Sequence, residues 1–331
     1  MPGPAGPGAG EGFLAVDSGG SGLRVVLGAP GRRPTATRES RIPVRTGPRG
    51  IDPGHLMEQL VPMVRSLSPE AGVTGLGTAV VGAAGLASLG DALRAELPGA
   101  LEREFGVRTV ALAADAVTAY AGALGPRAGA VVAAGTGLIA IGTDLKCWRR
   151  ADGWGHLLGD CGSGAWIGRA GLEAALRAHD GRPGGSTALL AVAEELFGPV
   201  RELPGKLYPR TDRPAVLASF APHVAACAEG DPVAGGILRR AAQHMAESVA
   251  AVCPAEGEPC LSRTGGLFSM GAALVVPLEE ELKRLLPHAR LVAAAGGPLD
   301  GSVQIATELA RGSFILPSDP SMLYVVTPKR G

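Results

Sequence analysis

Short apolar segments separated by glycine-rich turns dominate the first part of the chain. Residues 13–17 and 23–27 are two apolar runs, and the turn 18–22 between them contains three glycines. The residues after this turn are apolar and β-branched without a helical period, so the pattern predicts a β-hairpin. Neither a Walker loop nor a Rossmann fingerprint is present here.

Helical periodicity alternates with apolar strands in the next hundred residues. Asp52 and Pro53 supply an N-cap and a first helical position. Asp115 directly follows a predicted strand and opens the helix 116–124, a position where ligands collect in open α/β sheets. Alternatively, Asp115 only caps this helix. The pattern predicts, in chain order, helix 53–66, strand and loop 73–85, helix 86–97 and strand 107–113.

A boundary is expected at residues 126–129, after which strand, turn and strand follow again at 130–134, 135–137 and 138–142. We interpret this as a weak internal duplication of β-hairpins rather than a sequence repeat. The later pattern predicts helix 162–179, a mainly helical region 182–257, a strand that leads into 264–266, helix 269–286, strand 291–294 and helix 301–310.

Residues 129–168 carry the highest density of candidate chemistry. They combine buried strands, a Gly-Thr-Gly turn, a tryptophan between glycines and the loop Gly-Asp-Cys-Gly-Ser-Gly. Glycine is the most costly residue to order, so this density indicates a backbone that approaches a ligand closely. A phosphate-bearing or hydroxyl-rich ligand fits best.

The composition favours a small-molecule partner. The chain has 331 residues, of which 46% are hydrophobic, and its 31 basic and 31 acidic side chains balance. This length allows two domains, and the balanced charge gives no footprint for nucleic acid or a membrane surface. Residues 1–10 are expected to be a disordered leader without signal-peptide character, and no later stretch could span a membrane, so we expect a cytoplasmic protein.

The five cysteines are odd in number and form no C-x-x-C pair. This number and spacing favour reduced, mostly structural thiols.

Five motifs stand in an order and spacing that resembles the N-acetylglucosamine kinases of the BadF/BadG/BcrA/BcrD ATPase family, within the superfamily of sugar kinases, actin and heat-shock chaperones. The most specific is Gly-Trp-Gly-His-x-x-Gly-Asp-x-Gly-Ser at 153–163. The others are Asp-Ser-Gly-Gly-Ser at 17–21, Ala-Asp-Ala at 114–116, Gly-Thr-Gly at 135–137 and Thr-Gly-Gly-Leu-Phe at 264–268.

The resemblance implies an α/β fold of two ribonuclease H-like (actin-like ATPase) domains around a central cleft. It places them at residues 11–126 and 127–311, followed by a tail at 312–331 that is either poorly ordered or returns to the N-terminal domain. ATP and Mg²⁺ would lie at the floor of the cleft, with a hexose between the lobes.

The same resemblance assigns roles to individual residues. Asp115 would be the catalytic base and contact the sugar, and Asp17 would also hold Mg²⁺ through water. The expected sugar-site residues are Asp115, Trp154, Asp160 and Gly164. The expected nucleotide-binding residues are Asp17, Gly19, Gly20, Ser21, Gly135, Thr136, Gly137, Thr264, Gly265 and Gly266.

Simpler roles exist for most of these side chains. Asp17 could be only a turn residue. Asp160 could cap the helix that begins near residue 162. Trp154 could be part of the core, and His156 is expected to be structural.

Two positions depart from the family pattern. Cys161 stands where these sugar kinases generally carry Glu, and Gly22 stands where many relatives have Lys. Arg24 could replace the missing positive charge near the phosphates, depending on its direction on the strand.

The sequence therefore predicts an ATP-dependent kinase that phosphorylates the 6-hydroxyl of an amino sugar, N-acetylglucosamine or glucosamine. A second reading is an ATPase that activates a partner enzyme, but such activators hold an iron–sulfur cluster through cysteines, and the isolated cysteines argue against it. A third is a non-catalytic sugar or nucleotide sensor. Helices of the second half could supply a homodimer face.

Overall fold

The computed structural model describes residues 11–20, 22–32 and 36–327, so that the expected leader 1–10 and Ser21 lie outside the described residues. The described residues form two compact units. Unit 1 comprises those up to Ala128, together with Thr143–Trp148 and those from Ala293 onward. Unit 2 comprises Gly129–Gly142 and Arg149–Val292.

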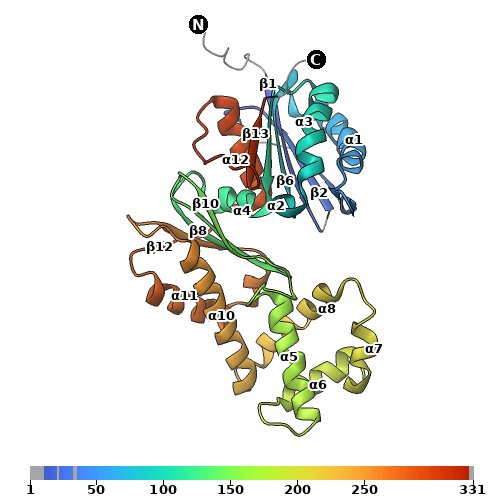
Figure 1. Ribbon diagram of the computed structural model, residues 1–331, viewed down its shortest axis with the longest axis vertical. Helices are drawn as coiled ribbons and strands as arrows, with labels where there is room; N and C mark the ends of the chain where they lie inside the picture. The colour runs from blue at the N-terminus through green and yellow to red at the C-terminus, as the bar shows by residue number, and fades with distance from the viewer. Residues whose placement is uncertain (1–10, 21, 33–35, 328–331) are drawn as a thin grey trace. The chain divides into compact units, whose positions relative to one another are not determined.

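Unit 1 is built on a six-stranded mixed sheet (Figure 1). The predicted hairpin is confirmed, because β1 and β2 pair antiparallel and β1 also pairs parallel with β6. The central strands are buried on both faces, which explains their nearly continuous apolar sequences. The strands in spatial order are β13 (Leu323–Val326), β7 (Thr109–Ala114), β6 (Gly75–Ala83), β1 (Glu11–Gly19), β2 (Gly22–Gly28) and β3 (Thr37–Ser40). A separate small ladder joins β4 (Thr46–Gly47) and β5 (Gly50–Ile51).

Helices cover both faces of this sheet (Figure 1). On one face lie α1 (Pro53–Ala71) and α3 (Asp91–Phe105), and on the other α4 (Asp115–Leu124) and α12 (Pro298–Arg311). The predicted N-cap of α1 is confirmed, since the Asp52 side chain accepts the N–H of His55 at 3.1 Å. The helix predicted over 86–97 is instead two helices, α2 (Leu86–Leu89) and α3, because the chain turns at Gly90.

The structure corrects the expected boundary at residue 311, because α12 belongs to unit 1. Small residues allow its backbone to approach α4: a Cβ on Gly301 would overlap the carbonyl oxygen of Thr118, and one on Gly122 would overlap that of Gly297. The Ser302 hydroxyl donates to the β1 carbonyl of Val16 at 2.9 Å.

The chain beyond α12 also packs on unit 1. Strand β13 pairs antiparallel with β7, so this part of the expected tail is regular structure. Trp148 lies edge-on against Tyr120 with ring centroids 5.2 Å apart, and its indole N–H donates to the Pro317 carbonyl at 2.7 Å.

Unit 2 contains a five-stranded sheet. Its strands in spatial order are β10 (Trp148–Asp152), β9 (Leu138–Thr143), β8 (Gly129–Ala134), β11 (Cys260–Thr264) and β12 (Arg290–Leu291). Strand β11 runs parallel to both β8 and β12. The predicted strand–turn–strand at 130–142 corresponds to β8 and β9, and β10 extends the sheet beyond these predicted strands.

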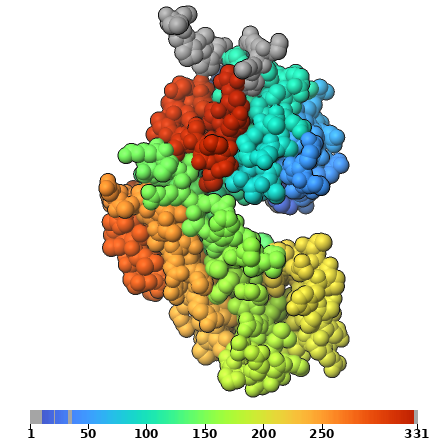
Figure 2. All heavy atoms as spheres, viewed as in Figure 1, coloured from blue at the N-terminus to red at the C-terminus, as the bar shows by residue number. Residues whose placement is uncertain are grey.

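The helices of unit 2 pack in two groups. In the first, α10 (Pro232–Val252) packs on β8 and on α11 (Ala272–Leu285). In the second, α5 (Gly164–His179) packs against α6 (Thr187–Phe197), α8 (Arg213–Ser219) and α9 (Ala221–Cys227), seen as green atoms beside yellow ones in Figure 2. The short elements η1 (Val200–Glu202), α7 (Leu203–Leu207) and η2 (Gly266–Met270) complete the unit.

The described part of the chain contains no helix that is both long enough and apolar enough to span a bilayer.

Candidate functional site

Asp115 stands out in unit 1 because it is exposed within a buried stretch. In the range from Val110 to Gly125, which is described in full, all residues except Asp115 are buried. Asp115 is the first residue of α4, and Ala114 holds the N-cap position, so the reading of Asp115 as the N-cap is wrong. Its carboxylate accepts the N–H of Ala116 at 2.9 Å and lies at the N-terminal end of the helix.

Asp17 is held by an ion pair across the first hairpin. It is 7% exposed and lies directly opposite Arg24 in the β1–β2 register. The Arg24 guanidinium donates to Asp17 Oδ2 through Nε at 3.0 Å and through a terminal nitrogen. The sequence did not determine the direction of the Arg24 side chain. The structure places its positive charge beside the Asp17 carboxylate.

The turn of this hairpin leaves room for a ligand. A Cβ on Gly19 or Gly20 would meet nothing within 4 Å. Gly22 differs, since it has a φ of +127° and a Cβ there would overlap the Ser40 carbonyl oxygen. The approach of β3 thus excludes any side chain at position 22, which explains why a lysine is absent.

Asp17 is the residue expected to hold Mg²⁺. Across residues 11–20, 22–32 and 36–327, no three His, Cys, Asp or Glu side chains gather into a metal-binding group. Mg²⁺ commonly keeps several waters and binds one or two carboxylates together with substrate phosphates. A single carboxylate at the open hairpin turn fits that kind of site, although Arg24 shares one of its oxygens.

In unit 2, the turn 135–137 is tied to the start of α5. The N–H groups of Gly164 and Ala165 donate to the carbonyls of Gly135 and Thr136 at 2.9 and 3.1 Å. Gly164 therefore supports the turn through its backbone, and a Cβ there would lie 2.8 Å from the Gly135 oxygen. A Cβ on Gly135 itself would meet nothing within 4 Å, so space remains beside the turn.

The segment 264–266 reaches the same edge of the unit 2 sheet. Because β8 and β11 are parallel, Thr264 pairs with Ala133, directly before the 135–137 turn. Gly265 has a φ of +107°, and a Cβ there would overlap the backbone of Ala134. The structure thus brings two of the predicted nucleotide-binding segments together.

Asp160 lies in a tightly constrained loop of unit 2. It is 8% exposed and has a φ of +54°, and its Oδ1 accepts the N–H of Gly155 at 3.0 Å. Burial raises the pKa of Asp160; the hydrogen bond from Gly155 opposes this shift, and the charge of Asp152 adds to it. The N-cap of α5 is Ser163, whose side chain accepts the N–H of Trp166, so the reading of Asp160 as that cap is wrong.

Asp152 is a residue that the sequence reasoning missed. Its two carboxylate oxygens accept the N–H groups of Asp160 at 2.6 Å and Cys161 at 2.8 Å. The Asp-Gly pair at 152–153 is a recognisable turn signal, but nothing in the sequence indicates which backbone groups the carboxylate would reach. Burial raises the pKa of the Cys161 thiol, so this side chain does not provide the negative charge of a glutamate.

Trp154 is not part of the core. It is 65% exposed, and the Arg150 guanidinium lies over its ring at 4.4 Å from the centroid. Leu157 and Leu158 in the same loop are also exposed. The loop therefore presents apolar side chains outward.

An apolar pocket of about 550 Å³ in unit 2 borders this loop. Leucines of α5, α7 and α8 contribute to its wall together with Arg169, Glu173 and Arg213, whereas His156 and Leu157 contribute the loop side. His156 and Leu157 lie between Trp154 and Asp160 in the sequence, but neither Trp154 nor Asp160 lines the pocket.

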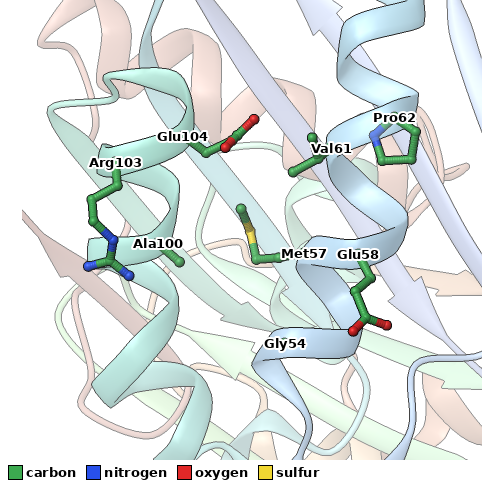
Figure 3. A pocket seen from close by; sticks show the side chains of 8 residues that line it. All are labelled: Gly54, Met57, Glu58, Val61, Pro62, Ala100, Arg103 and Glu104. Carbon is green, nitrogen blue, oxygen red and sulfur yellow. The ribbon is translucent and has the colours of Figure 1, made fainter.

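A second pocket, of about 520 Å³, lies between α1 and α3 in unit 1. Figure 3 shows Met57 of α1 pointing into the space between the helices, with Ala100 of α3 facing it. Its acidic residues are paired, Glu104 with Arg65 at 2.8 Å and Glu58 with Arg45 at 3.6 Å. None of the predicted site residues lines this pocket.

Solved structures confirm the expected α/β fold of the sugar kinases and actin-like ATPases. A proposed N-acetylglucosamine kinase from Chromobacterium violaceum is 27% identical, with a TM-score of 0.68 over 88% of this chain and 98% of that one. A ROK family glucokinase from Streptomyces griseus, solved with glucose and AMPPNP, is 21% identical, with a TM-score of 0.55 over 91% and 99% of the two chains, a likeness of fold alone.

The sequence profile of the BadF/BadG/BcrA/BcrD ATPase family matches residues 14–296, and the chain belongs to this family. A curated relative, the N-acetylmuramic acid/N-acetylglucosamine kinase of Clostridium acetobutylicum, is 30% identical over 201 residues. The match covers 58% of this chain and 65% of the relative, which is less than two thirds of that protein.

Proposed function

We propose that this protein is an ATP-dependent kinase that phosphorylates the 6-hydroxyl of an amino sugar, N-acetylglucosamine or glucosamine. The observation that carries the proposal is the position of Asp115, an exposed carboxylate at the start of α4 among buried neighbours. The names of the relatives, which include N-acetylglucosamine and N-acetylmuramic acid kinases, support the choice of substrate class.

In the proposed reaction, Asp115 accepts the proton of the sugar hydroxyl. The hydroxyl oxygen then forms a bond to the γ-phosphorus of ATP, the bond from that phosphorus to the β–γ bridging oxygen breaks, and ADP leaves. Phosphoryl transfer depends mainly on positioning and on charge neutralisation, so the base has only to orient the hydroxyl and accept its proton.

The nucleotide is assigned to open glycine turns and to Asp17. Backbone N–H groups at such turns suit phosphate oxygens because no side chain blocks their approach. Mg²⁺ would neutralise phosphate charge near Asp17. The proposed residues are Asp17, Gly19, Gly20, Ser21, Gly135, Thr136, Gly137, Thr264, Gly265 and Gly266.

The sugar is assigned to the loop of unit 2 in addition to Asp115. Asp160 would accept hydrogen bonds from sugar hydroxyls, which are stronger when the acceptor is ionised. The exposed indole of Trp154 offers a flat apolar surface to a sugar face. Gly164 is also proposed to line the sugar site, and its N–H supports the 135–137 turn. A cytoplasmic location, where ATP is available, completes the proposal.

A coupled ADP-release assay with ATP and Mg²⁺ tests this function. The sugar panel comprises N-acetylglucosamine, glucosamine, N-acetylmannosamine, N-acetylmuramic acid and glucose. We expect release that depends on N-acetylglucosamine or glucosamine, with a 6-phosphate product identified by mass spectrometry and NMR. Absence of sugar-dependent release from folded protein that still binds ATP would contradict the proposal.

A further inference from the structure

The last residue of β10 directs a carboxylate at the backbone of the Asp160 loop. Asp152 Oδ1 accepts the Asp160 N–H at 2.6 Å, and Oδ2 accepts the Cys161 N–H at 2.8 Å. A carboxylate that accepts backbone N–H groups forms charge-assisted hydrogen bonds, which are about twice as strong as neutral ones. Two such bonds to successive residues fix the peptide plane between them.

Glycines around Asp152 make room for its carboxylate. A Cβ on Gly159 would overlap Asp152 Oδ1, so the loop requires a glycine there. Gly153 and Gly155 have φ values of +73° and +83°, which let the chain turn around the carboxylate. The loop is thus folded about Asp152.

Asp160 needs such support because its own backbone is strained. Its φ of +54° lies in the left-handed region, an uncommon conformation for a non-glycine residue that is kept when its surroundings hold it in place. Its side chain is fixed by the Gly155 N–H at 3.0 Å, and its backbone N–H is fixed by Asp152. Without Asp152 the side chain would keep one anchor, but the residue that carries it would be free to leave the strained conformation.

Both oxygens of Asp152 are already used by backbone donors. Asp152 is therefore suited to act through Asp160 rather than to bind a sugar hydroxyl itself. We infer that Asp152 is a positioning residue that sets the Asp160 carboxylate for sugar recognition, an inference that rests on the proposed kinase function.

The test compares Asp152→Asn with Asp144→Asn. Asp144, in the turn between β9 and β10, is a matched control because its carboxylate also accepts two backbone N–H groups, those of Lys146 and Cys147, both at Oδ1. Asparagine tolerates the left-handed φ of +60° at position 152 but offers only one acceptor oxygen. Asp152→Ala, which removes both acceptors, is the stronger second variant.

Two measurements separate the steps of the inference. Hydrogen exchange at the Asp160 and Cys161 amides reports whether Asp152 holds the loop, whatever the protein's activity. Steady-state kinetics report whether the loop geometry matters for the sugar. We expect faster exchange at both amides and a sugar KM raised roughly tenfold, with the ATP KM within about twofold, and neither change in Asp144→Asn.

Unchanged amide exchange in Asp152→Ala would overturn the inference at its structural step. Faster exchange with an unchanged sugar KM would overturn it at its functional step, and Asp152 would then only stabilise the loop. If the wild-type protein phosphorylates no sugar, the proposed function fails by itself, the functional half of the inference falls with it, and exchange still decides whether Asp152 holds the loop.

Discussion

The Asp160 carboxylate occupies the space that a side chain at position 137 would need. Its Oδ2 lies 2.7 Å from the place where a Cβ on Gly137 would stand. A glycine that the sequence assigned to phosphate binding is therefore also required by the proposed sugar-binding carboxylate.

This relationship predicts that Gly137→Ala weakens sugar binding. The methyl group would displace the Asp160 carboxylate, and we expect the sugar KM to rise about tenfold or more. Gly135→Ala is the matched variant, since its Cβ would meet no atom within 4 Å, and we expect it to raise mainly the ATP KM. Equal effects of both substitutions on the two KM values would contradict this division.

Replacing Asp160 tests its assignment directly. Asp160→Asn keeps the shape of the side chain and an acceptor for the Gly155 N–H but removes the charge. We expect the sugar KM to rise by about one to two decades while the ATP KM changes little, because the hydrogen bonds from the sugar hydroxyls lose their ionic character. A comparable rise in the sugar KM and the ATP KM would indicate that Asp160 contributes to nucleotide binding.

The same variant should show a pH-dependent gain in stability. Burial raises the pKa of Asp160, so the folded state binds the proton more tightly than the unfolded state does. The free energy of unfolding therefore falls as pH rises from about 4 through the raised pKa, and the cost is fully present above it. We expect urea denaturation to find Asp160→Asn more stable than wild type at pH 7, with the difference lost near pH 3.

Asp144→Asn should have the opposite effect on stability at pH 7 and serves as a comparison. Hydrogen bonds from the N–H groups of Lys146 and Cys147 lower the pKa of Asp144. Its contribution to stability is present above its unfolded-state pKa and is lost as pH falls through the lowered folded value. A stabilising effect of this substitution at pH 7 would show that the hydrogen bonds are not maintained in solution.

Asp115→Ala should abolish most turnover. Loss of a general base costs about two to four decades in kcat, with little change in the ATP KM. Asp91→Ala is the control, because Asp91 is likewise an exposed first residue of a helix in unit 1. Turnover that stays within about threefold of wild type in Asp115→Ala would remove Asp115 from the mechanism.

The two glycines beside the first hairpin turn should respond in opposite ways. Gly22→Ala places a Cβ against the Ser40 carbonyl at a φ of +127°, and we expect a loss of roughly 3 kcal/mol or more in the free energy of unfolding. Gly20→Ala meets open space and should change stability by less than about 1 kcal/mol while raising the ATP KM. Thermal denaturation and nucleotide titration measure the two effects.

Local patterns in the sequence predicted many elements of both units. The hairpin β1–β2 follows from apolar runs around glycines, and the start of α1 follows from Asp52 and Pro53. Five short motifs in a characteristic order and spacing led to the family, and the profile over residues 14–296 confirms it. These features depend on neighbouring residues, so a single sequence contains the information.

Contacts between distant segments could not be predicted in the same way. Helix α12 was expected in the second domain, but the small residues Gly301 and Gly122 let it pack on α4, which precedes it by more than 170 residues. Nothing in the periodicity of either helix specifies its partner, because an apolar stripe fits many surfaces.

The sequence by itself determined the kinds of residue available for chemistry: Asp115 after a strand, Asp160 in a glycine loop and open turns for phosphates. Only the tertiary structure decided how they are held. The Arg24 ion pair to Asp17, the Asp152 bonds to the backbone at 160 and 161, and the place of the Asp160 carboxylate beside Gly137 all depend on strands and loops brought together by folding. Hydrogen bonds and steric exclusion act over a few ångströms, so they are fixed by the packed chain and not by spacing along it.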